Sequence, residues 1–119
     1  MPFRDANTHF RDILESIKLI DEFVEDMAFE KYCDDIKTKS AVERQMQIIA
    51  EAAYRLSDEA QILCPGPDWK GFRGMGNILR HQYHLVNDKI VWDTVKDDLP
   101  SLKAAVQRAL QAPEAKPRG

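Results

Sequence analysis

Residues 10–27 read FRDILESIKLIDEFVEDM, and their apolar residues recur every three or four positions. In an α-helix this spacing places the side chains on one face. The stretch therefore predicts an amphipathic helix from about residue 7 to residue 27. The apolar face consists of Phe10, Ile13, Leu14, Ile17, Ile20, Phe23, Val24 and Met27. The residues that follow, FEKYCDDIKTK, interrupt the period, so we expect a short helical turn around residues 29–33 and then a polar connection.

A second helix is expected to begin at Ser40, because Ser40–Glu43 matches a capping box. In that motif the serine hydroxyl and the glutamate carboxylate each accept a hydrogen bond from a backbone amide at the helix start. The helical period then continues through Val42, Met46, Ile49, Ala53, Leu56, Ala60 and Leu63. The sequence CPGP at residues 64–67 should end this helix, since proline cannot continue the hydrogen-bond ladder.

Three further helical segments are expected in the second half of the chain. Asp68 can cap a helix that ends near His84, and Asn87 with Asp88 can cap the next one. Pro100 either kinks that helix or stands as the first residue of a last helix, SLKAAVQRAL. No segment alternates with period two. The predicted fold class is therefore all-α, an antiparallel up-and-down bundle of about four to five helices.

Length and composition fit one small folded domain. With 119 residues the chain can bury a single core, which we assign to residues 1–111, and the tail at residues 112–119 is expected to be disordered. The net charge of −3 excludes a general polyanion binder, because such proteins are usually basic. No signal peptide or long apolar run is present, and Cys33 and Cys64 lack a metal-binding pattern. We expect a cytoplasmic protein without a membrane span, metal or cofactor.

The stretch GFRGMGNILRHQYH at residues 71–84 carries the candidate site. On an ideal helix Arg73, Asn77, Arg80 and His81 fall within about 100° of one another and so share one face. Arginine offers fixed, bidentate donors to a phosphate, and histidine can transfer a proton near neutral pH. The pattern is also typical of a solvated helix surface. The three glycines nevertheless oppose a helix by about 1 kcal/mol each, which favours a functional or packing reason for them.

This stretch resembles the signature of the HEPN superfamily, specifically the HepT-like toxins of MNT–HEPN toxin–antitoxin pairs. The similarity rests on Trp69, Asn77, Leu79, His81 and Tyr83. It extends to SAVERQMQIIAEAAYRLSDE and to IVWDTVKDDLPSLKAAV, and thus covers about residues 10–110. The resemblance implies a metal-independent ribonuclease in which His81 moves a proton and an arginine stabilises the charge that develops on the phosphate.

One position departs from the family pattern. The signature has an arginine immediately before the asparagine, and this chain has Gly76 there. Loss of such a donor typically lowers the rate of a reaction by about 10²–10³. Arg73 and Arg80 flank position 76 on the same side of the helix, and we expect one of them to supply the missing charge.

The resemblance also implies partners. Family members are typically homodimers that join across their signature helices, which would explain small residues at positions 71, 74 and 76. A cognate nucleotidyltransferase silences the toxin by transferring AMP to a tyrosine, here Tyr83, although a tyrosine at the edge of a helix face commonly only packs its ring. The alternatives to a toxin are a nuclease-inactive HEPN module that binds a nucleotidyltransferase and a purely structural helical domain.

Overall fold

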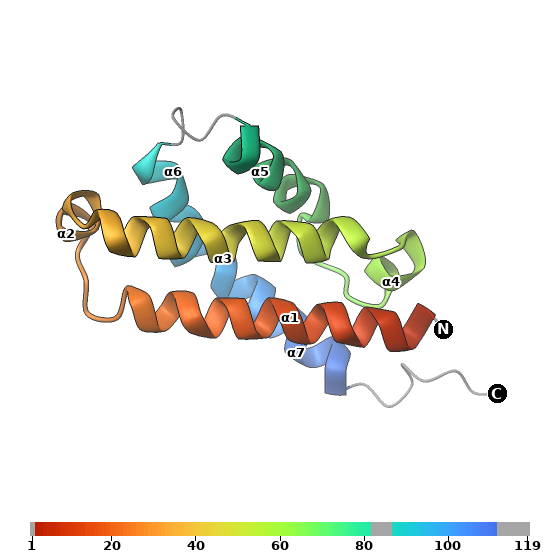
Figure 1. The fold of residues 1–119 in the computed structure, drawn as a ribbon. Coiled ribbons are helices and arrows are strands. Elements are labelled where there is room, and N and C mark those ends of the chain that lie inside the picture. Colours follow the sequence, from red (N-terminus) through yellow and green to blue (C-terminus); the bar gives the residue numbers. More distant parts are fainter. Residues whose placement is uncertain (1, 82–86, 112–119) are drawn as a thin grey trace.

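The computed structural model of the protein describes residues 2–81 and 87–111 (Figure 1). Within these residues all regular structure is helical, which confirms the predicted all-α class. The elements are α1 (Pro2–Phe23), α2 (Phe29–Asp34), α3 (Ile36–Arg55), α4 (Asp58–Ile62), α5 (Trp69–His81), α6 (Asp88–Asp93), the π-helical turn η2 (Thr94–Asp98) and α7 (Leu99–Gln111). The predicted helix end near His84 and the tail at residues 112–119 lie outside the described residues.

The core forms where α1 and α3 run side by side in opposite directions (Figure 1). Most of the apolar face predicted for α1 is buried, including Phe10, Ile13, Ile17 and Ile20. Leu14, Phe23 and Met27 are partly buried against the same core. On α3 the buried residues include Val42, Met46, Ile49 and Ala53. Burying each large aliphatic side chain contributes about 1.5–3 kcal/mol, so this pair of helices supplies much of the stabilisation.

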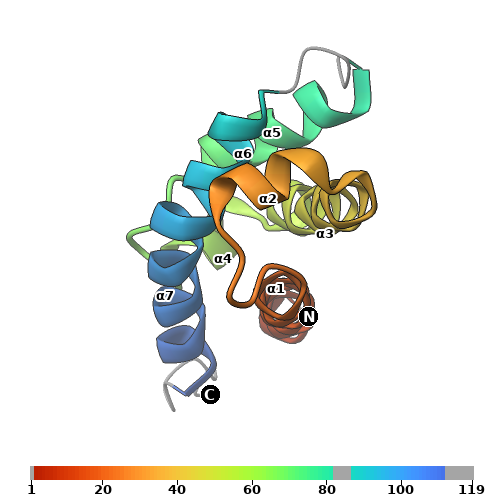
Figure 2. The ribbon, with the colours of Figure 1, turned by 90° about the vertical axis from the view of Figure 1, so that its left-hand side faces the viewer.

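Two further helices complete the bundle. Helix α5 packs on α3, and α7 packs on α1. In Figure 2 α1 and α3 are seen nearly end-on while α7 is seen from its side, so α7 crosses them steeply. None of the helices in the described part of the chain combines the length and the apolar character needed to cross a lipid bilayer.

The predicted start of the second helix at Ser40 is wrong. Helix α3 already begins at Ile36, because Asp35 caps it: its carboxylate accepts hydrogen bonds from the Thr38 amide at 3.0 Å and from the Thr38 hydroxyl at 2.8 Å. Ser40 and Glu43 therefore lie inside the helix. The capping-box pattern is present, but an earlier cap adds one more turn to the helix.

Two other predicted boundaries also shift. The helix expected to run unbroken to Leu63 is interrupted at Leu56, because Ser57 starts α4 by accepting a hydrogen bond from the Ala60 amide at 3.1 Å. Helix α1 begins at Pro2 and ends at Phe23, a few residues before the predicted end. Asp26 then adopts a φ of 59°, a left-handed conformation that turns the chain toward α2.

Helices α6 and α7 form one continuous helical segment around Pro100. Asn87 caps α6, as predicted, with its side-chain oxygen accepting from the Lys89 amide at 2.7 Å. Next to Pro100 the helix widens into η2, where the Leu99 amide donates to the Thr94 carbonyl. Proline has no amide hydrogen and clashes with the carbonyl four residues earlier, so a wider turn accommodates Pro100 inside the helical segment.

Candidate active site on helix α5

Helix α5 is fixed at its start by two hydrogen bonds. The Asp68 carboxylate accepts from the Gly71 amide at 3.0 Å, which confirms the predicted cap. The indole Nε1 of Trp69 donates to the Cys64 carbonyl at 3.1 Å, and its ring contacts Phe10 of α1 with ring centroids 6.5 Å apart. Trp69 is buried. The first turn of α5 is therefore held to the core.

The burial pattern separates two sides of α5. Trp69, Phe72, Gly76 and Leu79 are buried, whereas Lys70, Gly74, Asn77 and Ile78 are exposed. Arg73 is half-buried at the boundary. Of the residues predicted to share the polar face, Asn77 therefore lies on the outer side of α5. Arg73, one helical turn earlier, lies at the edge of that side.

The described residues offer no acidic partner to this outer side. Among them, Lys70, Arg73 and Asn77 form no ion pair and no side-chain hydrogen bond. Glu51 of α3 forms an exposed ion pair with Arg55 at 3.3 Å. The charges of Lys70 and Arg73 are thus not compensated by an acidic side chain of the described residues.

Arg80 and His81 form the last turn of α5 in the backbone, and their side chains lie outside the described residues. Tyr83 and His84 lie outside them altogether. The roles of His81 in proton transfer and of Tyr83 as AMP acceptor therefore stay predictions.

The three glycines of α5 have different surroundings. A Cβ at Gly71 would collide with the capping carboxylate of Asp68, so this glycine has a reason within the chain. A Cβ at Gly74 would meet no atom within 4 Å. Gly76, at the position where the resemblance leads us to expect an arginine, is buried. Only Gly74 combines small size with open space on the outer side of α5.

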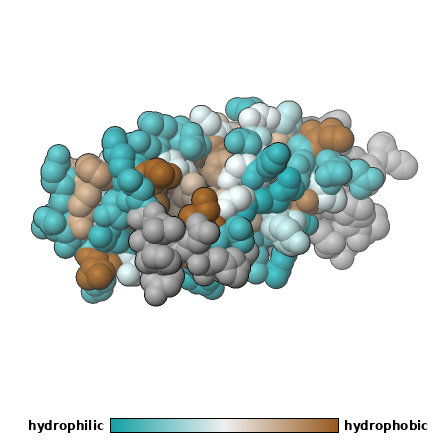
Figure 3. Space-filling view, turned by 90° about the horizontal axis from the view of Figure 1, so that it is seen from above, coloured by the Kyte–Doolittle hydropathy of each residue, from teal (hydrophilic) through white to brown (hydrophobic). Residues whose placement is uncertain are grey.

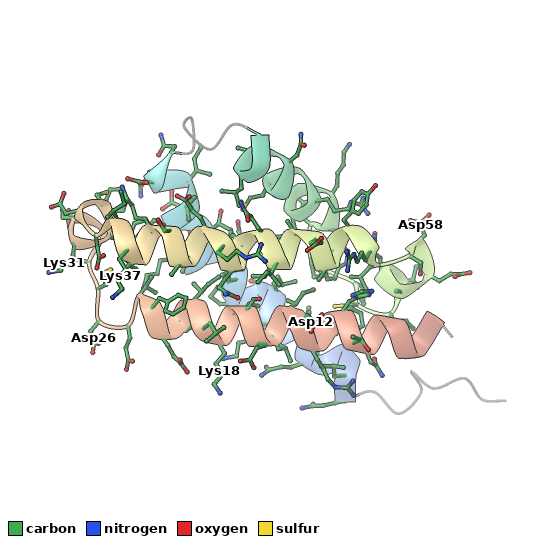
Figure 4. All side chains as sticks on the ribbon, viewed as in Figure 1. Asp12, Lys18, Asp26, Lys31, Lys37 and Asp58 are labelled. Carbon is green, nitrogen blue, oxygen red and sulfur yellow. The ribbon has the colours of Figure 1, made fainter. Side chains whose placement is uncertain are left out.

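Other cations lie elsewhere on the molecule. Lys18 of α1 points away on the side opposite to α5, and Lys31 and Lys37 lie at the α2 end (Figure 4). Figure 3 looks onto the side that carries α5, where hydrophobic side chains form separate spots among hydrophilic ones. The exposed hydrophobic residues include Ile78 of α5 and Ile90 of α6. This surface is mixed in character and has no broad apolar area on the described residues.

A polar cluster that the sequence did not reveal joins α3 to the start of α6. Lys39 Nζ lies 3.2 Å from Asp88 Oδ2, and both side chains are about a quarter exposed (23% and 30%). Burial, and then the Asp88 carboxylate, raise the pKa of Glu43, while Lys39 opposes the rise. The Tyr32 hydroxyl is buried beside these groups and has no hydrogen-bond partner among the described residues.

A cavity of about 460 Å³ lies between α5 and the η2–α7 segment. Its walls include Phe72 and Met75 of α5 and Asp98, Leu102 and Arg108 of the last helical segment. Asn77 and Arg73 do not line it. The cavity is therefore separate from the predicted polar face.

Together these features define a class of protein: a small helical bundle that presents cationic and polar residues on one helix. Comparison with known sequences gives the family. The profile described as "Ribonuclease HepT-like" matches residues 13–109. The chain belongs to the HepT-like ribonuclease family.

Individual relatives agree with this assignment. "Probable ribonuclease HepT" of Thermococcus cleftensis is 36% identical over 105 residues, which cover 88% of this chain and 96% of that protein. "Putative RNase MJ0127" of Methanocaldococcus jannaschii is 36% identical over 101 residues, covering 85% and 84%. "Putative RNase TTE0752" of Caldanaerobacter subterraneus is 31% identical over 103 residues, covering 87% and 92%. No solved structure gave a significant match.

Proposed function

We propose that this protein is a HepT-like ribonuclease toxin of a type VII toxin–antitoxin pair in the cytoplasm. The observation that carries the proposal is the outer side of α5, where Arg73 and Asn77 stand without an acidic partner among the described residues. An RNA phosphate is the anion that this face would receive in a family of ribonucleases.

In the proposed reaction His81 acts as the proton-transfer group. It removes the proton of a ribose 2′-hydroxyl, and the 2′-oxygen attacks the adjacent phosphorus. The bond from phosphorus to the 5′-oxygen breaks, and that oxygen takes up a proton. Asn77 orients the phosphate. Arg73 or Arg80 stabilises its extra negative charge in place of the arginine that Gly76 replaces, and no metal ion takes part.

The active form is proposed to be a homodimer that joins across α5. Gly74 supports this arrangement, because it lies exposed with open space where a second backbone could approach. Substitution Gly74→Trp should therefore convert a dimer into a monomer in analytical ultracentrifugation. A wild-type protein that is monomeric at micromolar concentration would contradict this arrangement.

Regulation is proposed to occur through a cognate nucleotidyltransferase that transfers AMP to Tyr83. The added phosphate and nucleoside would block the RNA site by charge and by volume. Mass spectrometry after co-expression with a nucleotidyltransferase encoded beside this protein should find the AMP mass on the peptide containing Tyr83. An unmodified peptide would exclude this form of regulation.

One observation favours a second function. Because Gly76 stands where the signature has an arginine, the protein could be a nuclease-inactive module that binds a nucleotidyltransferase. Expression without the partner separates the two functions: growth arrest that His81→Ala abolishes supports the toxin, and normal growth supports the binding module.

A further inference from the structure

The cavity between α5 and the η2–α7 segment exists because these two elements pack on different helices. Helix α5 packs on α3, and α7 packs on α1. In Figure 2 α5 lies above α3, while most of α7 extends downward beside α1. The facing sides of α5 and α7 therefore diverge, and the cavity between them measures about 460 Å³. Sites for small ligands in proteins typically have volumes of about 300–1,000 Å³.

The middle of this cavity is lined by apolar side chains. Phe72 and Leu102 line it from opposite walls, and only small parts of them stay exposed (8% and 1%). Met75 of α5 also lines the cavity and is partly buried. An aromatic ring and a thioether are polarizable and pack well against flat unsaturated rings. The lining therefore suits a ligand with a flat aromatic body.

Arg108 supplies a cation at one end of the cavity. Burial raises the pKa of the Cys64 thiol to about 11, and the charge of Arg108 opposes that rise, so the guanidinium lies near Cys64. Gly66 and Pro67, which follow Cys64 closely in the chain, line the same cavity. Arg108 forms no ion pair or hydrogen bond with any other described residue. Its parallel N–H donors match the oxygens of a phosphate.

The carboxylate of Asp68 also lines the cavity, and its charge has to be weighed against that of Arg108. The Asp68 carboxylate accepts a hydrogen bond from the Gly71 amide. It lies at the N-terminal end of α5, where the helix dipole is positive. The charge of Asp68 is thus partly compensated within α5, whereas no acidic side chain of the described residues pairs with Arg108.

Hydrogen-bonding groups line the opposite end of the cavity. Asp98 precedes Arg108 by ten residues, which corresponds to roughly 15 Å along a helix. Asp98 and Ser101 both line the cavity, and neither forms an ion pair or side-chain hydrogen bond within the described part of the chain. A carboxylate can accept two neighbouring N–H donors, which guanine offers on N1 and on its 2-amino group.

We propose that this cavity is a binding site for a guanine nucleoside monophosphate, with the phosphate on Arg108, the base beside Phe72 and the base edge on Asp98. This inference goes beyond the proposed ribonuclease function and does not depend on it. Arg73 and Asn77 of the proposed RNA face do not line the cavity. The nucleotide would therefore bind on a different side of α5 from the RNA.

The test is a titration of the full-length protein with guanosine 5′-monophosphate, followed by amide chemical shifts in NMR spectra. We expect shifts at residues 71–75 and 98–105. Three matched probes each lack one part of this ligand: guanosine the phosphate, inosine 5′-monophosphate the 2-amino group, and inorganic phosphate the nucleoside. Guanosine and inorganic phosphate should bind at least about tenfold more weakly, and inosine monophosphate about three- to tenfold more weakly.

Variants of the lining residues locate the two ends of the ligand. Arg108→Gln should weaken binding about 10–100-fold, because the charge-assisted hydrogen bonds to the phosphate are lost. Asp98→Asn should weaken it about tenfold. Ser101→Trp, at an exposed position, should fill the cavity and abolish binding. Lys103→Gln is the matched control, because Lys103 is exposed on α7 outside the cavity, and it should bind as wild type. Thermal unfolding should show all four variants to be folded.

The outcomes separate this site from simpler explanations. The absence of shifts with millimolar guanosine monophosphate would overturn the proposal, as would equal binding by Arg108→Gln and wild type. Equally tight binding of inorganic phosphate would also overturn it, since it would indicate an adventitious ion only. Inosine monophosphate that binds as tightly as guanosine monophosphate would overturn the contact between the base and Asp98. A wild type that cleaves no RNA would refute the proposed function alone, because the titration does not involve cleavage.

Discussion

Asp68 and Gly71 are joined by a hydrogen bond of 3.0 Å that closes the first turn of α5, and the same carboxylate fills the space that a side chain at position 71 would need. The glycine and the cap therefore depend on each other. Gly74, one turn along the helix, has no such neighbour. The two positions allow a comparison within one helix.

Alanine at these two glycines should have different effects on stability. Gly74→Ala should raise the free energy of unfolding of the isolated chain by about 0.5–1 kcal/mol, because alanine is the better helix former. Gly71→Ala should gain about 1 kcal/mol less, because the new Cβ displaces the Asp68 cap. Urea unfolding measures both. When Asp68 is also replaced by alanine, Gly71→Ala and Gly74→Ala should change the free energy of unfolding equally. A remaining difference would refute the dependence of Gly71 on the Asp68 cap.

The start of α3 gives a second prediction. Asp35→Ala should lower the melting temperature by about 5 °C, because the Thr38 amide loses its acceptor. Asp35→Asn keeps an acceptor and should lose less, and Ser40→Ala should have almost no effect. Hydrogen bonds from Thr38 lower the pKa of Asp35, so its contribution should be present above the pKa of the unfolded chain and should disappear as the pH falls through the folded value. If Ser40→Ala lowered the melting temperature more than Asp35→Ala does, the interpretation of Ser40 as the helix cap would be correct instead.

Glu43 gives a prediction with the opposite pH dependence. Burial and Asp88 raise its pKa in the folded state. The favourable contribution of Glu43 to the stability of the fold is therefore complete below the pKa of Glu43 in the unfolded chain. It is lost as the pH rises through the pKa of Glu43 in the folded protein. Glu43→Gln should remove this pH-dependent loss of stability. The substitution should therefore raise the melting temperature more at pH 7 than at pH 4. Glu51→Gln, at the exposed Glu51–Arg55 pair, is the control, and an equal effect there would contradict the explanation.

Arginine introduced at position 76 tests the expectation that Arg73 or Arg80 does the work of an arginine at that position. If Arg73 or Arg80 supplies the charge, replacing that residue by alanine should lower cleavage about 10²–10³-fold. Adding Gly76→Arg to the impaired variant should recover only part of the loss, because the new arginine has to extend from the buried side of α5, and Gly76→Ala should recover none. Full activity in both single variants, Arg73→Ala and Arg80→Ala, would refute the proposal that one of these arginines supplies the charge.

Local patterns predicted the parts of the fold that depend on neighbouring residues. The apolar period of α1 and the caps Asp68 and Asn87 could be predicted because each involves residues within one or two turns. The start of α3 was missed because two caps, Asp35 and Ser40, compete within a few residues. The sequence alone could not reveal the pairing of Lys39 with Asp88, since no local period connects residues 49 positions apart.

For the candidate site, the outer position of Asn77 follows from helical geometry, whereas Arg73 was predicted on the same polar face and is half-buried at its boundary. The burial of Gly76 could not be predicted from the helix alone, because it depends on which side of α5 packs on α3. That packing places an arginine introduced at residue 76 on the inner side, from which it would have to extend to reach a phosphate.

Cleavage of RNA through His81 is tested most directly by the rate at which purified wild type and His81→Ala cleave total RNA in the presence of EDTA. We expect the wild type to cleave without metal ions, the products to end in cyclic phosphate, and His81→Ala to lose at least about 10²-fold in rate. Equal cleavage by both proteins, or none by the wild type, would refute cleavage through His81.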